Sequence, residues 1–109
     1  MALDIVDLRA FYASPLGKAA QRFLAQAVAR RWPDCAGATV LGVGYACPYL
    51  DRWRGQAVRV LSFMPAAQGV VAWPKDAPNA SALVDILDMP LPDVCVDRLL
   101  IVHALETAE

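Results

Sequence analysis

The chain has 109 residues, which is enough for one domain of ordinary size. Ten Lys and Arg residues against eleven Asp and Glu residues give a net charge of -1, and no basic run indicates nucleic acid or an anionic membrane as a partner. Apolar residues make up 58% of the chain and charged residues 19%. An average soluble domain is about 45–50% apolar, so this chain has more apolar side chain than one small domain normally buries.

The three cysteines, Cys35, Cys47 and Cys95, form no CxxC pair and lie near no histidine cluster. We interpret them as small apolar residues in a reducing compartment, with no disulfide and no metal site. The first residues lack the basic start and apolar core of a signal peptide. No apolar stretch approaches the roughly 18 residues of a membrane span. We therefore expect a cytoplasmic protein of bacterial type.

The first predicted element is a helix over residues 15–31. Ser14 can cap this helix, Pro15 suits its first position, and Pro33 prevents its continuation. Apolar residues at helical spacing predict the side that packs on the core: Leu16, Ala20, Phe23, Leu24, Ala27 and Val28. We assign residues 1–37 to an N-terminal segment that contains this helix.

Short apolar runs predict four strands, over residues 38–41, 58–63, 81–84 and 98–102. Helical segments are expected between them, over residues 48–54 and as a turn within 65–72. Strands that alternate with helices predict an α/β fold with a mostly parallel sheet over residues 38–109, in one structural domain with the N-terminal segment. In such sheets ligands bind at the carboxyl ends of the strands.

Several residues at the predicted strand ends are suited to ligand binding. After the first strand, Gly42-Val43-Gly44 forms a glycine loop, in which Gly44 lets a ligand approach the backbone and later N–H groups can face a carboxylate. Taken alone, such a loop is more often a tight turn. Asp85 and His103 follow the third and fourth strands; a solvated acid and a histidine with a local hydrogen bond are the alternatives for them.

Three segments of the chain resemble class I S-adenosylmethionine-dependent methyltransferases of the methyltransferase type 11 kind. Residues 40–48 fall on the family's first strand and glycine loop. Residues 84–93 (VDILDMPLPD) are similar to its third strand and turn, and residues 96–106 (VDRLLIVHALE) to its fourth strand and the His-x-Leu-Glu sequence after it. The last two segments are the more specific part of the resemblance.

The resemblance implies a Rossmann-like fold that is incomplete, with about four of the family's seven strands, so that the chain is the N-terminal portion of such a domain. It implies S-adenosylmethionine as the cofactor and methyl transfer (EC 2.1.1) to an unknown acceptor in a full-length form. Whether this chain acts as an enzyme by itself stays open, and no catalytic residue is assigned. The implied cofactor contacts are Gly42, Gly44, Tyr45, Ala46, Ser62, Phe63, Met64, Asp85, Ile86 and His103.

Within this set, the resemblance implies that Asp85 accepts a hydrogen bond from the adenine amino group and that Ile86 packs on the ring. Phe63 and Met64 can stack on adenine. The family usually has acidic residues at the places of Gly42 and Ser62, so two charged contacts to the cofactor are missing here.

These departures favour an alternative function, a non-catalytic methyltransferase-like interaction module. It would pair with a partner, or with a second copy as a homodimer, through the exposed edge of the fourth strand. Binding of another nucleotide is a third possibility, because glycine loops after strands are shared among α/β folds. The excess of apolar residues agrees with strands that belong to a larger sheet, and we expect a fragment or a truncated reading frame.

Overall fold

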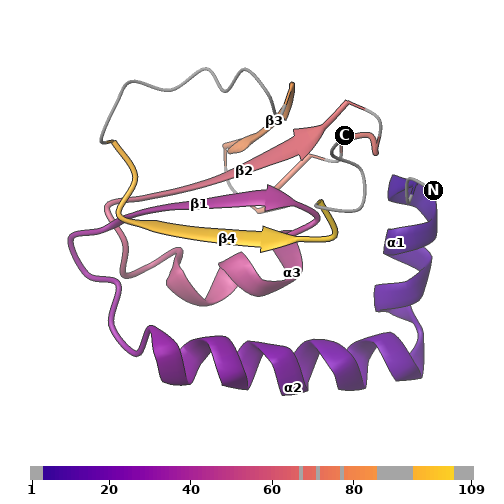
Figure 1. Cartoon of the computed structure of the whole chain (residues 1–109), viewed down its shortest axis with the longest axis horizontal. Coiled ribbons are helices and arrows are strands. Elements are labelled where there is room, and N and C mark those ends of the chain that lie inside the picture. Colours follow the sequence, from indigo (N-terminus) through magenta and orange to yellow (C-terminus); the bar gives the residue numbers. More distant parts are fainter. Residues whose placement is uncertain (1–3, 67, 71, 77, 86–94, 105–109) are drawn as a thin grey trace.

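The computed structural model describes residues 4–66, 68–70, 72–76, 78–85 and 95–104. Its elements in chain order are α1 (Ile5–Ala13), α2 (Pro15–Arg31), β1 (Thr39–Gly44), α3 (Cys47–Leu50), the 3-10 turn η1 (Asp51–Trp53), β2 (Arg59–Pro65), β3 (Ser81–Val84) and β4 (Arg98–Val102). Helices α2 and α3 lie below the sheet, and α1 stands beyond the arrowheads of the strands (Figure 1). The expected α/β fold with a parallel sheet is confirmed.

The four strands form one sheet in the order β3-β2-β1-β4, and every neighbouring pair is parallel. At the centre Gly42 of β1 is paired with Ser62 of β2 and with Leu100 of β4. The chain therefore builds outward from β1 to β3 and then returns to the other side of β1. In open α/β sheets this reversal of order places a ligand crevice between the carboxyl ends of the two strands concerned. Here those strands are β1 and β4.

The predicted bounds of α2, β3 and β4 agree with the structure, whereas β1 and β2 run further than expected. Strand β1 continues to Gly44, so that the predicted glycine loop is the last part of the strand. Strand β2 continues to Pro65, because its last two residues pair with Leu83 and Val84 of β3. The helical turn expected within residues 65–72 is one turn long. In it the N–H groups of Gln68 (3.0 Å) and Gly69 (3.1 Å) donate to the carbonyl of Pro65.

Helix α1 was not predicted, although its end signals are present in the sequence. The Asp4 carboxylate accepts a hydrogen bond from the N–H of Val6 at 2.7 Å and caps the helix. Ser14 is the only residue between α1 and α2. Its N–H donates to the carbonyl of Phe11 and ends α1, while its hydroxyl accepts from the N–H of Gly17 and caps α2.

The two helices meet in a tight corner at Gly17. A Cβ atom at this position would lie 1.8 Å from the carbonyl oxygen of Phe11 and 2.9 Å from Cα of Tyr12. Both are backbone atoms, so neither can move without shifting α1. Gly17 is therefore required for the angle between α1 and α2.

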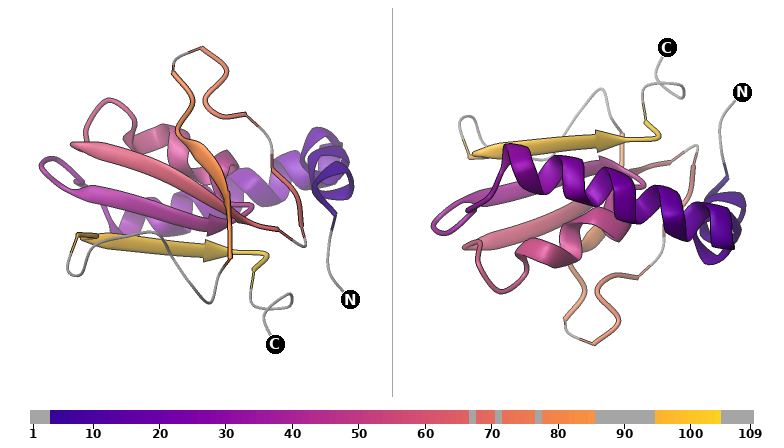
Figure 2. Two further views of the ribbon diagram at one scale, coloured as in Figure 1. Left: turned by 90° about the horizontal axis from the view of Figure 1, so that it is seen from above. Right: turned by 90° about the horizontal axis from the view of Figure 1, so that it is seen from below.

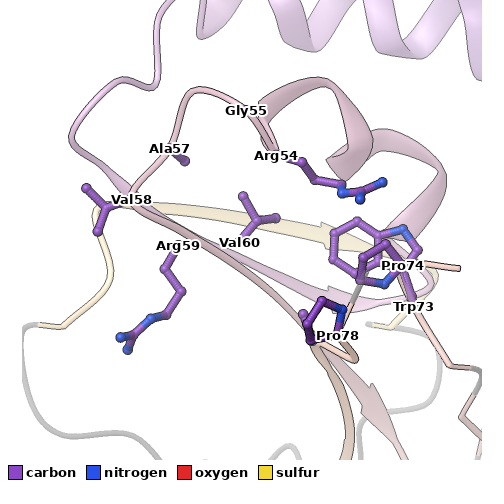
Figure 3. Close-up of a pocket in the computed structure, with 10 residues that line it drawn as sticks. Arg54, Gly55, Ala57, Val58, Arg59, Val60, Trp73, Pro74 and Pro78 are labelled. Atoms are coloured by element: carbon purple, nitrogen blue, oxygen red, sulfur yellow. The ribbon is translucent and has the colours of Figure 1, made fainter. Parts of the chain in front are cut away.

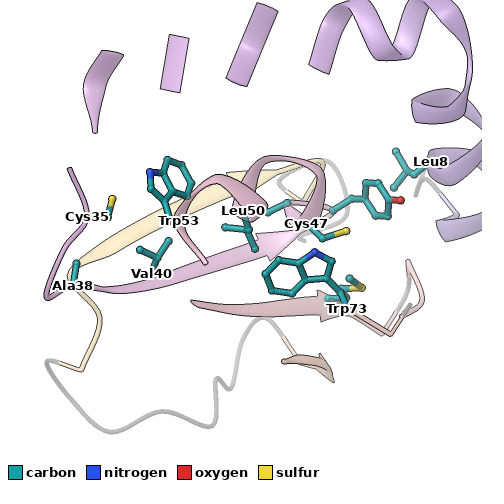
Figure 4. Close-up of a cluster of buried hydrophobic side chains, with 11 residues drawn as sticks. Leu8, Cys35, Ala38, Val40, Cys47, Leu50, Trp53 and Trp73 are labelled. Carbon is teal, nitrogen blue, oxygen red and sulfur yellow. The ribbon is translucent and has the colours of Figure 1, made fainter. Parts of the chain in front are cut away.

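The main core lies between the sheet and the helices below it (Figure 4). Successive strand residues point to opposite faces, so Val40 of β1 and Met64 of β2 enter this core from above. Gly42 leaves room for α3, since a Cβ there would lie 2.6 Å from Cβ of Ala46. The buried members are Leu8, Cys35, Ala38, Val40, Tyr45, Ala46, Cys47, Leu50, Trp53, Met64 and Trp73.

The opposite face of the sheet carries a second apolar cluster, formed by Leu41, Val43, Phe63, Val84 and Ala104. Among the described residues no helix lies on this face, as the view from above shows (Figure 2). The described part of the fold therefore has helices on one side of the sheet only.

The predicted core side of α2 is wrong in part. Leu16 is 72% exposed and Phe23 is 70% exposed. The residues that face the body include Gly17, which is buried, and Gln21, whose side-chain amide donates to the carbonyl of Pro48 in α3 at 2.9 Å. The apolar stripe of α2 is wider than its contact with the sheet, and the larger side chains lie on its outer part.

We expect Gly17→Ala to destabilise the fold by about 1–3 kcal/mol, because the added methyl group overlaps the backbone of α1. Urea denaturation measures the free energy of unfolding. Gly55→Ala is the matched control, since a Cβ at Gly55 meets no atom within 4 Å. Equal stability of the two variants would contradict the tight corner.

Candidate functional site

The carboxyl ends of the strands meet at one edge of the sheet, which we call the rim. Helix α1 lies against this rim through one side of the helix. Ile5 donates its N–H to the carbonyl of Gln68 at 2.8 Å, Leu8 is buried in the main core, and Tyr12 reaches the ends of β1 and β4. The spacing of these three residues, three and four apart, places them on the same side of the helix.

Tyr12 is the centre of an aromatic cluster at the rim. Its ring stacks on that of Tyr45 with centroids 5.6 Å apart and meets the rings of Tyr49 and His103 edge-on at 5.9 Å. Its hydroxyl is 2.7 Å from the hydroxyl of Tyr49 and 2.9 Å from Nε2 of His103, within hydrogen-bonding distance of both. One tyrosine of α1 thus connects the segments that follow β1 and β4.

Gln68 connects the same rim to β2. Its side-chain amide donates to the backbone carbonyl of His103, and its backbone carbonyl accepts from the N–H of Ile5 in α1. The side chain is buried, and Oε1 has no hydrogen-bond partner among the described residues. His103 has a φ angle of 55°, in the left-handed region that histidine occupies more readily than most residues. Together with Tyr12, Tyr45 and Tyr49, these two residues form what we call the rim cluster.

The crevice expected between β1 and β4 is closed. Gly44 has a φ of 91°, and a Cβ atom at this position would lie 2.1 Å from the carbonyl oxygen of Val102 and 2.8 Å from Cβ of Ala104. The N–H of Tyr45, the next residue, donates to the same Val102 carbonyl at 2.8 Å. Gly44 therefore permits a close approach between two strands of this chain.

Burial raises the pKa values of the hydroxyl and thiol groups of the rim further above neutral pH. Desolvation, followed by the hydrogen bond to Tyr49, raises the pKa of Tyr12 far above its usual value, and desolvation also raises the pKa of Tyr49. Burial raises the pKa of Tyr45 to about 12 and that of the Cys47 thiol to about 11. These groups can donate and accept hydrogen bonds, but they are not ionised bases at neutral pH.

The residues expected from the sequence to contact a ligand fall into three places. The rim contains Gly44, Tyr45, Asp85 and His103; Asp85 is exposed directly after β3. The main core contains Gly42, Ala46, Ser62 and Met64, the last three with no exposed surface. Phe63 belongs to the cluster on the other face. Ile86, the 88–93 turn and residues 105–106 lie outside the described residues.

Ser62 lies inside the sheet because β2 extends three residues beyond it, to Pro65. Its Oγ is buried and has no hydrogen-bond partner among the described residues. The rim end of β2 is thus formed by Pro65 and the turn after it, where the buried amide of Gln68 is located.

Sequence reasoning missed Tyr12, Tyr49 and Gln68. The signal for Tyr12 was available, because the Asp4 cap and the spacing of Ile5, Leu8 and Tyr12 together predict a helix with one packed side. No comparable signal exists for Gln68, whose role depends on contacts with distant parts of the chain.

A separate pocket of about 400 Å³ opens beside the first residues of β2 (Figure 3). Arg54 lies over the ring of Trp73, with 5.8 Å between the guanidinium carbon and the ring centroid. Its guanidinium forms salt bridges with Asp51 at 3.2 Å and Asp76 at 2.7 Å. Arg54, one of the two arginines that line this pocket, is therefore already paired within the chain, and none of the expected ligand contacts lines the pocket.

Two kinds of feature were searched for in the described residues and not found. These residues contain no group of three or more His, Cys, Asp or Glu side chains placed to hold a metal ion. None of the helices they form combines the length and the apolar character needed to cross a membrane.

The raised pKa of Cys47 predicts how stability depends on pH. The thiol's ordinary pKa is 9.0 and its folded value about 11, so the unfolded chain ionises first as the pH rises. The contribution of the protonated thiol to stability is complete below the ordinary pKa and is lost as the pH approaches the folded one. We expect Cys47→Ala to remove up to about 2 kcal/mol of the decrease in unfolding free energy across this window. Urea denaturation over the window measures it, with Cys95→Ala as control; an unchanged slope in Cys47→Ala would contradict the burial of this thiol.

Comparison of the chain with protein-family models, with curated proteins and with solved structures gives no significant match. The geometry of the rim is therefore the basis for the function proposed next.

Proposed function

We propose that the chain binds S-adenosylmethionine at the rim and that it derives from a methyltransferase-like domain. The observation that carries this proposal is the convergence of Gly44, Asp85 and His103 at one edge of a parallel sheet of order β3-β2-β1-β4. This is the edge at which open α/β sheets bind ligands, and the order reverses beside Gly44.

The residues at the rim fit this cofactor in part. Asp85 is exposed at the end of β3, where a carboxylate can accept a hydrogen bond from an adenine amino group. The buried Oε1 of Gln68 is an acceptor with no partner among the described residues, suited to an amino group. However, the end of β4 closes the crevice at Gly44, and Tyr12 of α1 covers Tyr45. Binding therefore requires α1 to leave the rim and places the cofactor over Tyr45 and Asp85, outside the closed crevice.

When bound, S-adenosylmethionine supplies an electrophilic methyl group, and the contribution of the protein to such a transfer is largely positioning. Asp85 orients the adenine end. The tyrosines of the rim cluster stay protonated at neutral pH and act as hydrogen-bond partners. The methyl acceptor is not assigned, and whether this chain catalyses the transfer by itself is part of the test.

Titration calorimetry with S-adenosylmethionine and S-adenosylhomocysteine tests the proposal. We expect Asp85→Ala to weaken binding about 10- to 100-fold, since a hydrogen bond to a charged group contributes about 1.5–3 kcal/mol. Asp76→Ala is the matched control, because this carboxylate is paired with Arg54 far from the rim. The absence of any binding heat at millimolar ligand would overturn the proposal.

A second variant tests whether α1 competes with the ligand. Tyr12→Phe keeps the ring but removes the hydroxyl that joins Tyr49 and His103. A larger fraction of molecules then has an open rim, and the apparent affinity rises by the same factor. We expect an increase of about 5-fold or more, because two hydrogen bonds worth about 0.5–1.5 kcal/mol each are removed. Val6→Ala, on the exposed side of α1, should leave the affinity unchanged. Weaker binding by Tyr12→Phe would show that α1 forms part of the site.

The alternative function, a non-catalytic module that binds through a sheet edge, is favoured by one observation. Two large apolar residues of the edge strand β4, Leu99 and Ile101, are about half exposed, at 50% and 44%.

A further inference from the structure

The pocket beside the first residues of β2 exists because β3 covers only the later part of its neighbour. Pairing between the two strands begins at Ser62, so the first three residues of β2 have no partner in β3. The N–H of Ala80 would continue the ladder to Val60, but it donates to the carbonyl of Trp73 at 2.7 Å instead. The chain before β3 thus turns away from β2, and the pocket of about 400 Å³ lies between them.

This arrangement directs backbone hydrogen-bonding groups of Val60 toward the pocket. Ser62 donates its N–H to the carbonyl of Ala80, which lies on the β3 side of β2. Backbone groups of alternate residues in a strand point to the same side, so the N–H of Val60 points to that side as well. No residue of β3 lies opposite Val60, which itself lines the pocket. Its N–H is therefore a donor that a ligand can use.

Contacts within the chain hold the wall of the pocket that faces β2. The backbone N–H of Trp73 donates to the side chain of Asn79 at 3.1 Å, which closes the loop before β3. The indole N–H of Trp73 donates to Asp51 at 3.2 Å, and the Arg54 guanidinium joins Asp51 to Asp76. A pocket that is fixed in this way before binding requires little ordering when a ligand enters.

The lining combines apolar side chains with one arginine that is not paired. Aliphatic residues, prolines and Trp73 supply most of the surface, and the two charged lining residues are Arg54 and Arg59. Within the part of the chain that the structure describes, the exposed side chain of Arg59 forms no ion pair. Arg59 directly precedes Val60, and Figure 3 shows Arg59 and Trp73 on opposite sides of Val60. One end of the pocket thus attracts an anion, whereas the rest is apolar.

We propose that this pocket binds a small organic acid. The guanidinium of Arg59 and the N–H of Val60 hold its carboxylate, and its apolar body lies along Val60 toward Trp73 and Pro78. Hydrogen bonds from a guanidinium to a carboxylate are charge-assisted and stronger than neutral ones. The volume of the pocket lies within the range of small-ligand sites, about 300–1,000 Å³.

This site is separate from the proposed cofactor function. The pocket lies at the first residues of β2, whereas the rim is formed by the carboxyl ends of the strands. Failure of either proposal therefore leaves the other intact, and calorimetry with S-adenosylmethionine measures the rim independently.

The probe for the pocket is cinnamate, which joins one carboxylate to a flat apolar body. An NMR titration of the full chain follows the backbone amide signals and gives the dissociation constant. We expect a constant on the order of 1 mM or lower for a ligand of this size, with movement of the Val60 amide signal. Cinnamamide lacks the charge and acetate lacks the apolar body. Each should bind at least about tenfold more weakly than cinnamate.

Three substitutions and a control test the assigned contacts. Arg59→Gln should weaken cinnamate binding at least about tenfold, because it removes the charged donor, and Arg59→Lys should restore part of the affinity. Val58→Asp, at a 71% exposed lining position, adds a repelling carboxylate and should weaken binding in the same direction. Arg52→Gln is the matched control, since it removes the same charge from an exposed residue outside the pocket. The affinity for S-adenosylmethionine should be the same in all of these variants.

Any one of three results rules the proposal out. The first is a Val60 amide signal that does not move at cinnamate concentrations well above the expected dissociation constant. The second is acetate binding as tight as that of cinnamate, which would indicate ion pairing at the surface only. The third is an unchanged dissociation constant in both Arg59→Gln and Val58→Asp. Circular dichroism of each variant separates loss of binding from loss of the fold.

Discussion

The close approach of β1 and β4 at Gly44 is the constraint on which the whole rim depends. Any side chain at this position would overlap the carbonyl of Val102, so the two strand ends can meet only with glycine there. Because they meet, the N–H of Tyr45 is paired with the carbonyl of Val102, and the rings of Tyr45 and His103 both contact the ring of Tyr12. A single tyrosine from α1 can then contact both strand ends.

The rim cluster that results is compact and contains no carboxylate, whereas the family that the chain resembles usually has acidic residues among its cofactor contacts. Its polar atoms belong to phenols, an imidazole and an amide, and burial raises the pKa of the phenols. Asp85 is the charged residue of the original set, at the one strand end that the rim cluster does not cover. A ligand at this edge would thus meet one exposed carboxylate beside a surface of hydrogen-bonding phenol, imidazole and amide groups.

Much of the fold could be predicted from the sequence. Helix α2 and strands β3 and β4 have local signals strong enough to set their ends: Ser14 and Pro15 for the helix, and uninterrupted apolar runs for the strands. The extension of β2 to Pro65 could not be predicted, because it depends on pairing with β3 and not on local preference. From local sequence alone, Pro65 is expected to lie beyond the end of the strand.

The site was harder to predict than the fold. A glycine after a strand suggests space for a ligand, but whether a ligand or another strand fills that space is decided by residues 58 or more positions away in the sequence. Gly44 and Val102 show this clearly. The same holds for Gln68, which is buried only because α1, β2 and β4 converge on it. Long-range packing of this kind leaves no periodic pattern.

Ser14 fixes how α1 and α2 are joined. One residue terminates α1 and starts α2, and Gly17 holds the helices so closely that no flexible linker separates them. The two helices are thus rigidly joined, with α1 across the rim and α2 below the sheet (Figure 1). A rotation of α2 would therefore also move α1. The position of α1 on the rim is therefore set by Ser14 and Gly17 together.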